Sequence, residues 1–151
     1  MKRLIIQSVL PLTIISFVLI SQWKYVLVVD GPDDFFVGFP LIYKGPGFHT
    51  SLSTQYFISE MIFNLIVYFS ISLIVCKIIN RFYTINIPKK LYTSFWIGFG
   101  VFILFFIYLF HELDNRIHLK RDFEVEVIES GFAFFNLQPT ERPEIDKSNT
   151  P

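Results

Sequence analysis

Cysteine and histidine are scarce in this sequence, which contains one cysteine and three histidines. The single Cys76 excludes a disulfide within the chain and a metal site built from several cysteines. Basic and acidic residues balance to a formal net charge of zero, so whole-chain charge predicts no nucleic-acid partner. The nucleophile elbow, the phosphate-binding loop and paired metal-binding motifs are also absent. Composition and motifs therefore predict neither an enzyme nor a cofactor.

Charged residues are few, and apolar residues are abundant. They make up 17% and 52% of the chain, against about 25% and about 45–50% in soluble domains. A helix needs roughly 20 apolar residues to cross a bilayer, and three stretches approach this length. We predict transmembrane helices near residues 4–26, 57–79 and 91–111, the first being an uncleaved anchor rather than a signal peptide.

The predicted fold class is an all-α membrane protein with three transmembrane helices and a small extracytoplasmic loop and β-hairpin element. Its orientation follows from basic residues, which favour the cytoplasmic side of short loops. Such residues precede the first predicted span and separate the second from the third: Lys2, Arg3, Lys77, Arg81, Lys89 and Lys90. We therefore expect a cytoplasmic amino terminus and an extracytoplasmic carboxyl terminus.

A stiff aromatic loop, residues 30–55, connects the first two predicted spans. Its stretch GFPLIYKGPGFHTS, residues 38–51, combines proline and glycine with aromatic side chains, and this composition restricts the backbone. One interpretation is a docking surface for a partner, a lipid or a ligand; the other is a rigid connector that caps the helices. The candidate docking residues are Phe36, Phe39, Tyr43 and Phe48.

The segment GFPLIY, residues 38–43, follows the first predicted span and precedes turns and the second span. In this arrangement the chain resembles small uncharacterised bacterial membrane proteins that carry a Gly-Phe-Pro-plus-aromatic loop at the same place. The resemblance covers about residues 28–75. It implies a bacterial membrane location but no activity, and it carries over no catalytic residue. With the orientation expected from the basic residues, we predict a location in the bacterial cytoplasmic (inner) membrane with a periplasmic carboxyl terminus.

A polar stripe marks the second predicted span. Its members recur at every fourth position: Glu60, Asn64, Tyr68, Ser72 and Cys76. Four residues turn a helix by about 400°, so these side chains share one face, which should contact protein rather than lipid. One interpretation is hydrogen bonding between helices, and the alternative is a substrate or proton path that begins at Glu60.

Beyond the third span, the sequence predicts that the helix continues outward for one to three turns. His111 and His118 are seven residues apart and would share a face of that extension. Together with His49 they are weak candidates for metal ligands, because their spacing is not that of a helical zinc motif. The favoured interpretation is a solvated helical extension without a metal.

Residues 123–127 alternate between apolar and polar, which predicts a strand. Ser130 and Gly131 can turn the chain, and residues 132–137 form a second apolar run, so residues 112–137 would end in a β-hairpin. An isolated hairpin is marginally stable, so it must pack on the loop, the membrane surface or another protein. Strand-like residues at 26–29 or 35–37 could join it. Residues 138–151 read as a disordered tail, separate from the membrane region at 1–111.

Two functions are consistent with these features. The first is a small accessory or scaffold subunit that docks to a larger membrane assembly through the aromatic loop and the hairpin. The alternative is an oligomeric membrane protein that handles a small ligand or an ion through the polar stripe. The expected partners are the lipid bilayer and other membrane-protein subunits or further copies of the chain, without nucleic acid.

Overall fold

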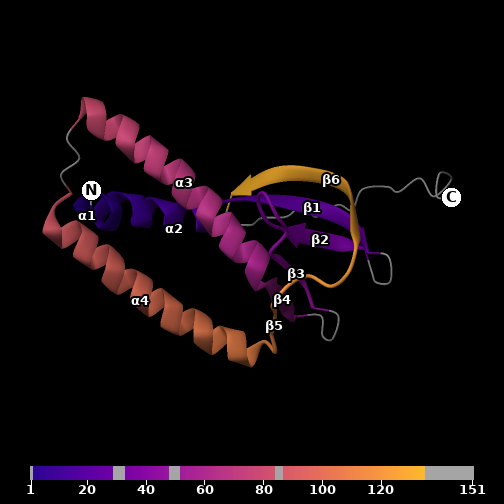
Figure 1. The fold of residues 1–151 in the computed structure, drawn as a ribbon. Coiled ribbons are helices and arrows are strands. Elements are labelled where there is room, and N and C mark those ends of the chain that lie inside the picture. The colour runs from indigo at the N-terminus through magenta and orange to yellow at the C-terminus, as the bar shows by residue number, and fades with distance from the viewer. Residues whose placement is uncertain (1, 29–32, 48–51, 84–86, 135–151) are drawn as a thin grey trace.

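A six-stranded mixed sheet and three helical segments make up the described chain, residues 2–28, 33–47, 52–83 and 87–134 of a computed structural model (Figure 1). The helical elements are α1 (Lys2–Leu4), the π-helix η1 (Ile5–Val9), α2 (Leu10–Leu19), α3 (Ile58–Phe82) and α4 (Lys89–Glu112). The strands are β1 (Ile20–Val28), β2 (Asp34–Val37), β3 (Lys44–Pro46), β4 (Thr54–Phe57), β5 (Arg116–His118) and β6 (Val125–Phe134). Elements α1, η1 and α2 follow one another without a break.

The strands lie in the order β5-β4-β3-β2-β1-β6. Neighbouring strands are antiparallel, except that β4 and β5 are parallel. Figure 1 shows the sheet at one end of the helices, where α2 ends, α3 begins and α4 ends. All three helical segments therefore reach the sheet at the same side of the molecule.

The predicted all-α fold with three transmembrane helices is wrong, because the chain forms a six-stranded sheet and the first predicted span leaves the helix to enter that sheet. The helix ends at Leu19, and Ile20 adopts extended angles of φ −112° and ψ 115°. From there β1 pairs with β2 on one side and β6 on the other, which satisfies its backbone groups. A charge-free apolar run does not by itself distinguish a helix from a strand that is buried between neighbours.

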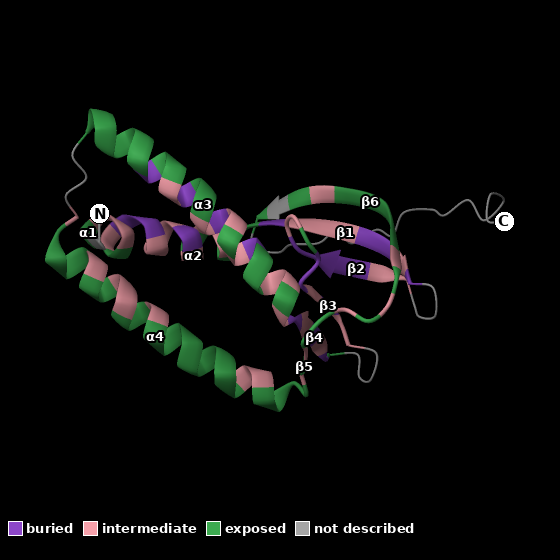
Figure 2. Cartoon of the chain, in the orientation of Figure 1, coloured by how far each residue is buried: buried purple, intermediate pink, exposed green. Residues whose placement is uncertain are grey.

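Helices α3 and α4 lie where the second and third spans are predicted. By length and composition both are apolar enough to cross a membrane, whereas the helix at Ile5–Leu19 is shorter. None of the residues of α4 is buried, and α3 buries one face only (Figure 2). Two candidate spans thus replace the predicted three.

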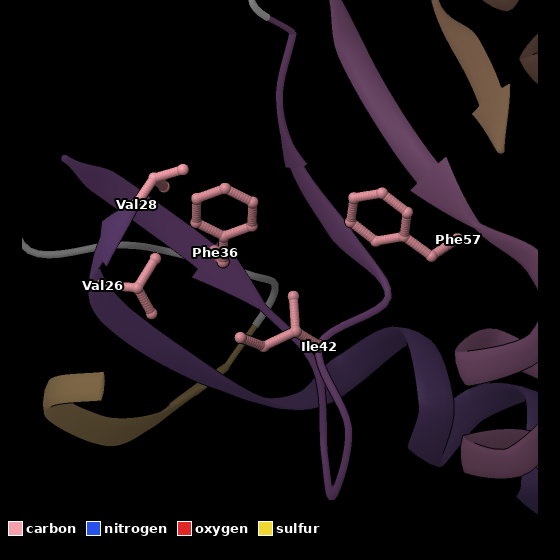
Figure 3. Close-up of a cluster of buried hydrophobic side chains, with 5 residues drawn as sticks. All are labelled: Val26, Val28, Phe36, Ile42 and Phe57. Carbon is pink, nitrogen blue, oxygen red and sulfur yellow. The ribbon is translucent and has the colours of Figure 1, made fainter. Parts of the chain in front are cut away.

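The predicted loop at residues 30–55 contains strands β2 and β3 and the start of β4. Side chains from this segment and from the strands beside it form the core of the sheet, shown in Figure 3: Val26, Val28, Phe36, Ile42 and Phe57. The Phe36 ring packs directly over Gly45, whose missing side chain leaves room for the ring. Strand β2 thus buries three consecutive side chains, including Phe36, which the sequence analysis placed at the surface.

The predicted β-hairpin after residue 123 is also wrong, because β6 is one continuous strand. It runs through Ser130 and Gly131 and pairs with β1 along its length. A Cβ atom on Gly131 would lie 2.7 Å from the Trp23 ring, so this glycine permits close packing rather than a turn. The suggestion that residues 26–29 join this element is confirmed for residues 26–28.

The predicted helical extension stops at Glu112, the last residue of α4. Asp114 follows with a positive φ of 49°, and the chain then enters β5, beside β4. The Asn115 side chain fixes this junction, because its Oδ1 accepts a hydrogen bond of 2.7 Å from the Thr54 amide. The segment after α4 thus belongs to the same sheet as the loop, whereas the predicted tail at 138–151 lies outside the described residues.

Candidate functional site

An apolar cavity of about 460 Å³ lies where the sheet meets α2, α3 and α4. Strands β3, β4 and β5 form one wall, and the three helices form the others. The residues that line it are Phe17, Val18, Tyr43, Lys44, Tyr56, Ile58, Met61, Phe102, Phe106, Ile107, Phe110 and Ile117. Its size falls within the roughly 300–1,000 Å³ that is typical of small-molecule sites.

The strand register explains the sheet wall. Lys44 lies opposite Tyr56, and Tyr56 lies opposite Ile117, so the three side chains form a row across β3, β4 and β5. Their sequence neighbours Gly45 and Phe57 are buried and belong to the opposite face of the sheet. The same alternation that builds the core therefore directs this row toward the helices.

Aromatic side chains form the wall from α4. Phe102, Phe106 and Phe110 are four residues apart and share one helix face, with ring centroids 6.4 Å and 6.2 Å apart. Tyr56 contacts the last two of these rings, at centroid distances of 6.2 Å and 5.7 Å. Through Tyr56, the sheet holds α4 in place and closes this side of the cavity.

The polar groups of the cavity gather on its sheet side. Lys44 is half-buried, and this burial lowers the pKa of its ammonium group. Within the described residues, Lys44 Nζ forms no hydrogen bond or ion pair. Burial raises the pKa of Tyr43 to about 12, helped by the charges of Tyr56 and Tyr68 and opposed by a hydrogen bond with Ser21. The cavity thus has one cationic corner in an otherwise apolar lining.

A second cavity of about 290 Å³ lies between α2 and α4 and is lined by apolar residues. Val18 and Phe102 line both cavities, so the two spaces adjoin at these side chains. The remaining residues of the second cavity are Ile14, Ile15, Leu19 and Phe99. Apolar lining therefore extends from the sheet along the helices, on both sides of Val18 and Phe102.

The polar stripe of α3 faces protein, and the hydrogen bonds of Asn64 and Tyr68 go to backbone groups rather than to side chains of other helices. Asn64, Tyr68, Ser72 and Cys76 are the buried residues of α3. Asn64 hydrogen-bonds the backbone of Leu41 through both of its polar atoms, at 2.6 Å and 3.0 Å. The Tyr68 hydroxyl donates to the carbonyl of Ile20, at 2.7 Å. The stripe therefore attaches α3 to the sheet and to the bend between β2 and β3.

Glu60, the first member of the stripe, contacts the segment between β5 and β6 instead. Its carboxylate accepts hydrogen bonds from the Ser59 hydroxyl and, at 3.3 Å, from the Arg121 amide. The Ser59 amide donates to the Leu119 carbonyl, which also lies 2.8 Å from the Ser59 hydroxyl, so the single hydroxyl proton is shared between this carbonyl and Glu60. Ser59 and Glu60 therefore hold the segment between β5 and β6 against the start of α3.

The four candidate docking residues do not form one exposed patch. Phe36 is fully buried, and Tyr43 is 6% exposed. Phe39 is half-buried between Tyr68 and Phe132, with ring centroids 6.3 Å and 5.3 Å away. Phe48 lies outside the described residues. The folding of β2 and β3 into the sheet buries the side chains that were expected to face outward.

The histidines do not meet at one site in the described chain. His111 lies near the end of α4, His118 lies in β5 beside the Phe57 ring, and His49 is outside the described residues. No group of three metal-ligating side chains lies together among the residues that the structure describes. The sequence analysis missed Lys44 and Phe106, although Lys44 is the lone base of the loop and residues 102–110 repeat phenylalanine at helical spacing.

No protein-family model, curated protein or solved structure matches this chain. The functional conclusion therefore depends on the cavity and on the elements that build it.

Proposed function

We propose that this chain is a small membrane-anchored protein that binds an amphiphilic ligand in the cavity between the sheet and the helices. The observation that carries the proposal is the cavity itself, which combines a long apolar lining with one cation, Lys44, that has no partner among the described residues. Sites for small molecules commonly pair an apolar lining with a few placed polar groups. An amphiphile has this distribution of polarity.

The membrane anchor is supported by α4. Its side chains are apolar along most of the helix, and Leu104, at its middle, is 70% exposed. Large contiguous apolar surfaces are rare on soluble monomers and mark contact with lipid or protein. The outer face of α3 is likewise apolar and exposed, as Figure 2 shows in green. A bilayer would cover both faces at once, with the sheet outside the hydrocarbon.

A matched pair of substitutions on α3 tests ligand binding. Met61 lines the cavity, whereas Ile66 is 58% exposed on the outer face of the same helix. Protein in phospholipid nanodiscs is labelled with a photoreactive long-chain amphiphile, and labelled peptides are identified by mass spectrometry. Met61→Trp should fill the cavity and abolish labelling of α2 and the Phe102–Phe110 stretch, and Ile66→Trp should leave it unchanged. Equal labelling in both variants would refute the cavity as the site.

An accessory subunit remains a second candidate function, supported by β6. This strand is at the edge of the sheet, and its Phe132 and Phe134 are 65% and 68% exposed. Exposed edge strands pair readily with another chain, and aromatic residues anchor such contacts. Phe132→Ser together with Phe134→Ser should then release the chain from a larger assembly on native gels while membrane abundance is unchanged.

A further inference from the structure

We propose that the ligand is a long-chain carboxylate whose head group binds Lys44 and whose chain extends between α2 and α4. This inference rests on the proposed function and names the class of ligand. It joins two observations: Lys44 at the sheet wall, which has no partner among the described residues, and the two adjoining apolar cavities.

Lys44 is half-buried, so its ammonium group keeps only part of its contact with water. An ammonium ion removed from water loses hydration, and this loss is recovered only by a partner of opposite charge or by hydrogen bonds. In the described chain the Lys44 ammonium has neither. A bound carboxylate would supply both at once, because a charge-assisted hydrogen bond is stronger than one between neutral groups.

The lining favours one negative charge over two. Lys44 is the one cation among the described residues that line the cavity. A phosphate monoester carries about −1.5 to −2 charges at neutral pH, so part of its charge would stay unpaired there. The Tyr56 hydroxyl, which has no hydrogen-bond partner among the described residues, can donate to the second carboxylate oxygen. One ammonium and one neutral donor match a carboxylate.

The alkyl chain of the ligand would lie among apolar side chains of α2 and α4. The first cavity, which Lys44 lines, adjoins the second cavity at Val18 and Phe102, and the second cavity lies between α2 and α4. Every residue that lines the second cavity is apolar, including Ile14 and Phe99 farther from the sheet. A carboxylate at the sheet and an alkyl chain along the helices place each part of the ligand in its preferred surroundings.

The test compares two photoreactive probes of equal chain length, palmitic acid and hexadecanol, in phosphatidylcholine nanodiscs at mildly alkaline pH. In the full chain, labelling of α2 and α4 by the acid should exceed labelling by the alcohol about tenfold, the order of one charge-assisted hydrogen bond. Lys44→Met should abolish this difference and leave alcohol labelling intact. Lys44→Arg should preserve the preference, and Lys120→Met, at an exposed lysine on the sheet side, should not alter it.

The outcomes separate this inference from the proposed function. Equal labelling of the cavity by acid and alcohol would overturn the role of Lys44 and leave an amphiphile site. Labelling that Met61→Trp does not reduce would show general contact with lipid and overturn both. A lysophosphatidate that displaces the acid probe better than unlabelled palmitate does would overturn the assignment to a carboxylate.

Discussion

Asn64 should be one of the most sensitive positions for stability in the described chain. Its side chain is fully buried; Nδ2 donates to the Leu41 carbonyl at 2.6 Å, and Oδ1 accepts from the Leu41 amide at 3.0 Å. Asn64→Leu removes both hydrogen bonds and leaves two backbone groups without partners. Each such group costs about 1–3 kcal/mol when buried; because Leu41 is partly exposed, we expect a total loss of about 2–4 kcal/mol.

The assay is thermal unfolding in mild detergent, followed by the loss of the monodisperse peak. For a chain of this size, the expected loss lowers the midpoint by about 4–16 °C. Ser70→Ala is the matched control, because the exposed Ser70 hydroxyl donates only within α3, to the Ile66 carbonyl. Asn64→Asp keeps the acceptor but replaces the donor, so it should also destabilise. If Asn64→Leu unfolds at the temperature of the Ser70→Ala variant, the reasoning is refuted.

Three further predictions concern the sheet, the ligand and the membrane. Gly45→Ala should destabilise the protein by about 1–3 kcal/mol in the same assay because its Cβ would clash with the Phe36 ring, whereas Gly98→Ala meets no neighbouring atom and should not destabilise. As pH rises, labelling by the acid probe should decline at a pH lower than the ordinary pKa of lysine. Burial lowers the pKa of Lys44, and only its ammonium form binds a carboxylate; Lys44→Arg should therefore remove this decline. A topology reporter fused at Lys90 should give a cytoplasmic signal, and an outside signal would overturn the predicted orientation.

The helices α3 and α4 were predictable because helix length and periodicity are local properties of the sequence. The repeat of polar residues from Asn64 to Cys76 also indicated which face of α3 meets protein. The hydrogen-bond partners of Asn64 and Tyr68 were not predictable, because they are backbone groups of Leu41 and Ile20, and any residue type supplies these. The periodicity of side chains shows which face of a helix is polar, but it does not identify the backbone groups that this face binds.

The strands were harder to predict because their pairing is long-range. Residues 20–28 satisfy their backbone groups through β6, about 100 residues later in the chain, and no local signal announces this partner. Gly131 was interpreted as a turn, although its role is to let β6 approach Trp23. The cavity depends on the same pairing, because only the register of β3 and β4 brings Lys44 beside Tyr56.

Tyr56 should control whether the cavity exists at all. No residue of α4 is buried, and the rings of Phe106 and Phe110 contact the sheet through Tyr56. Tyr56→Leu removes the ring that holds α4 and should reduce labelling by the acid and the alcohol alike. Tyr56→Phe keeps the ring and removes the hydroxyl, so it should reduce labelling by the acid alone. If both variants change the two probes equally, the hydroxyl does not bind the head group, and Tyr56 acts on the ligand only through the position of α4.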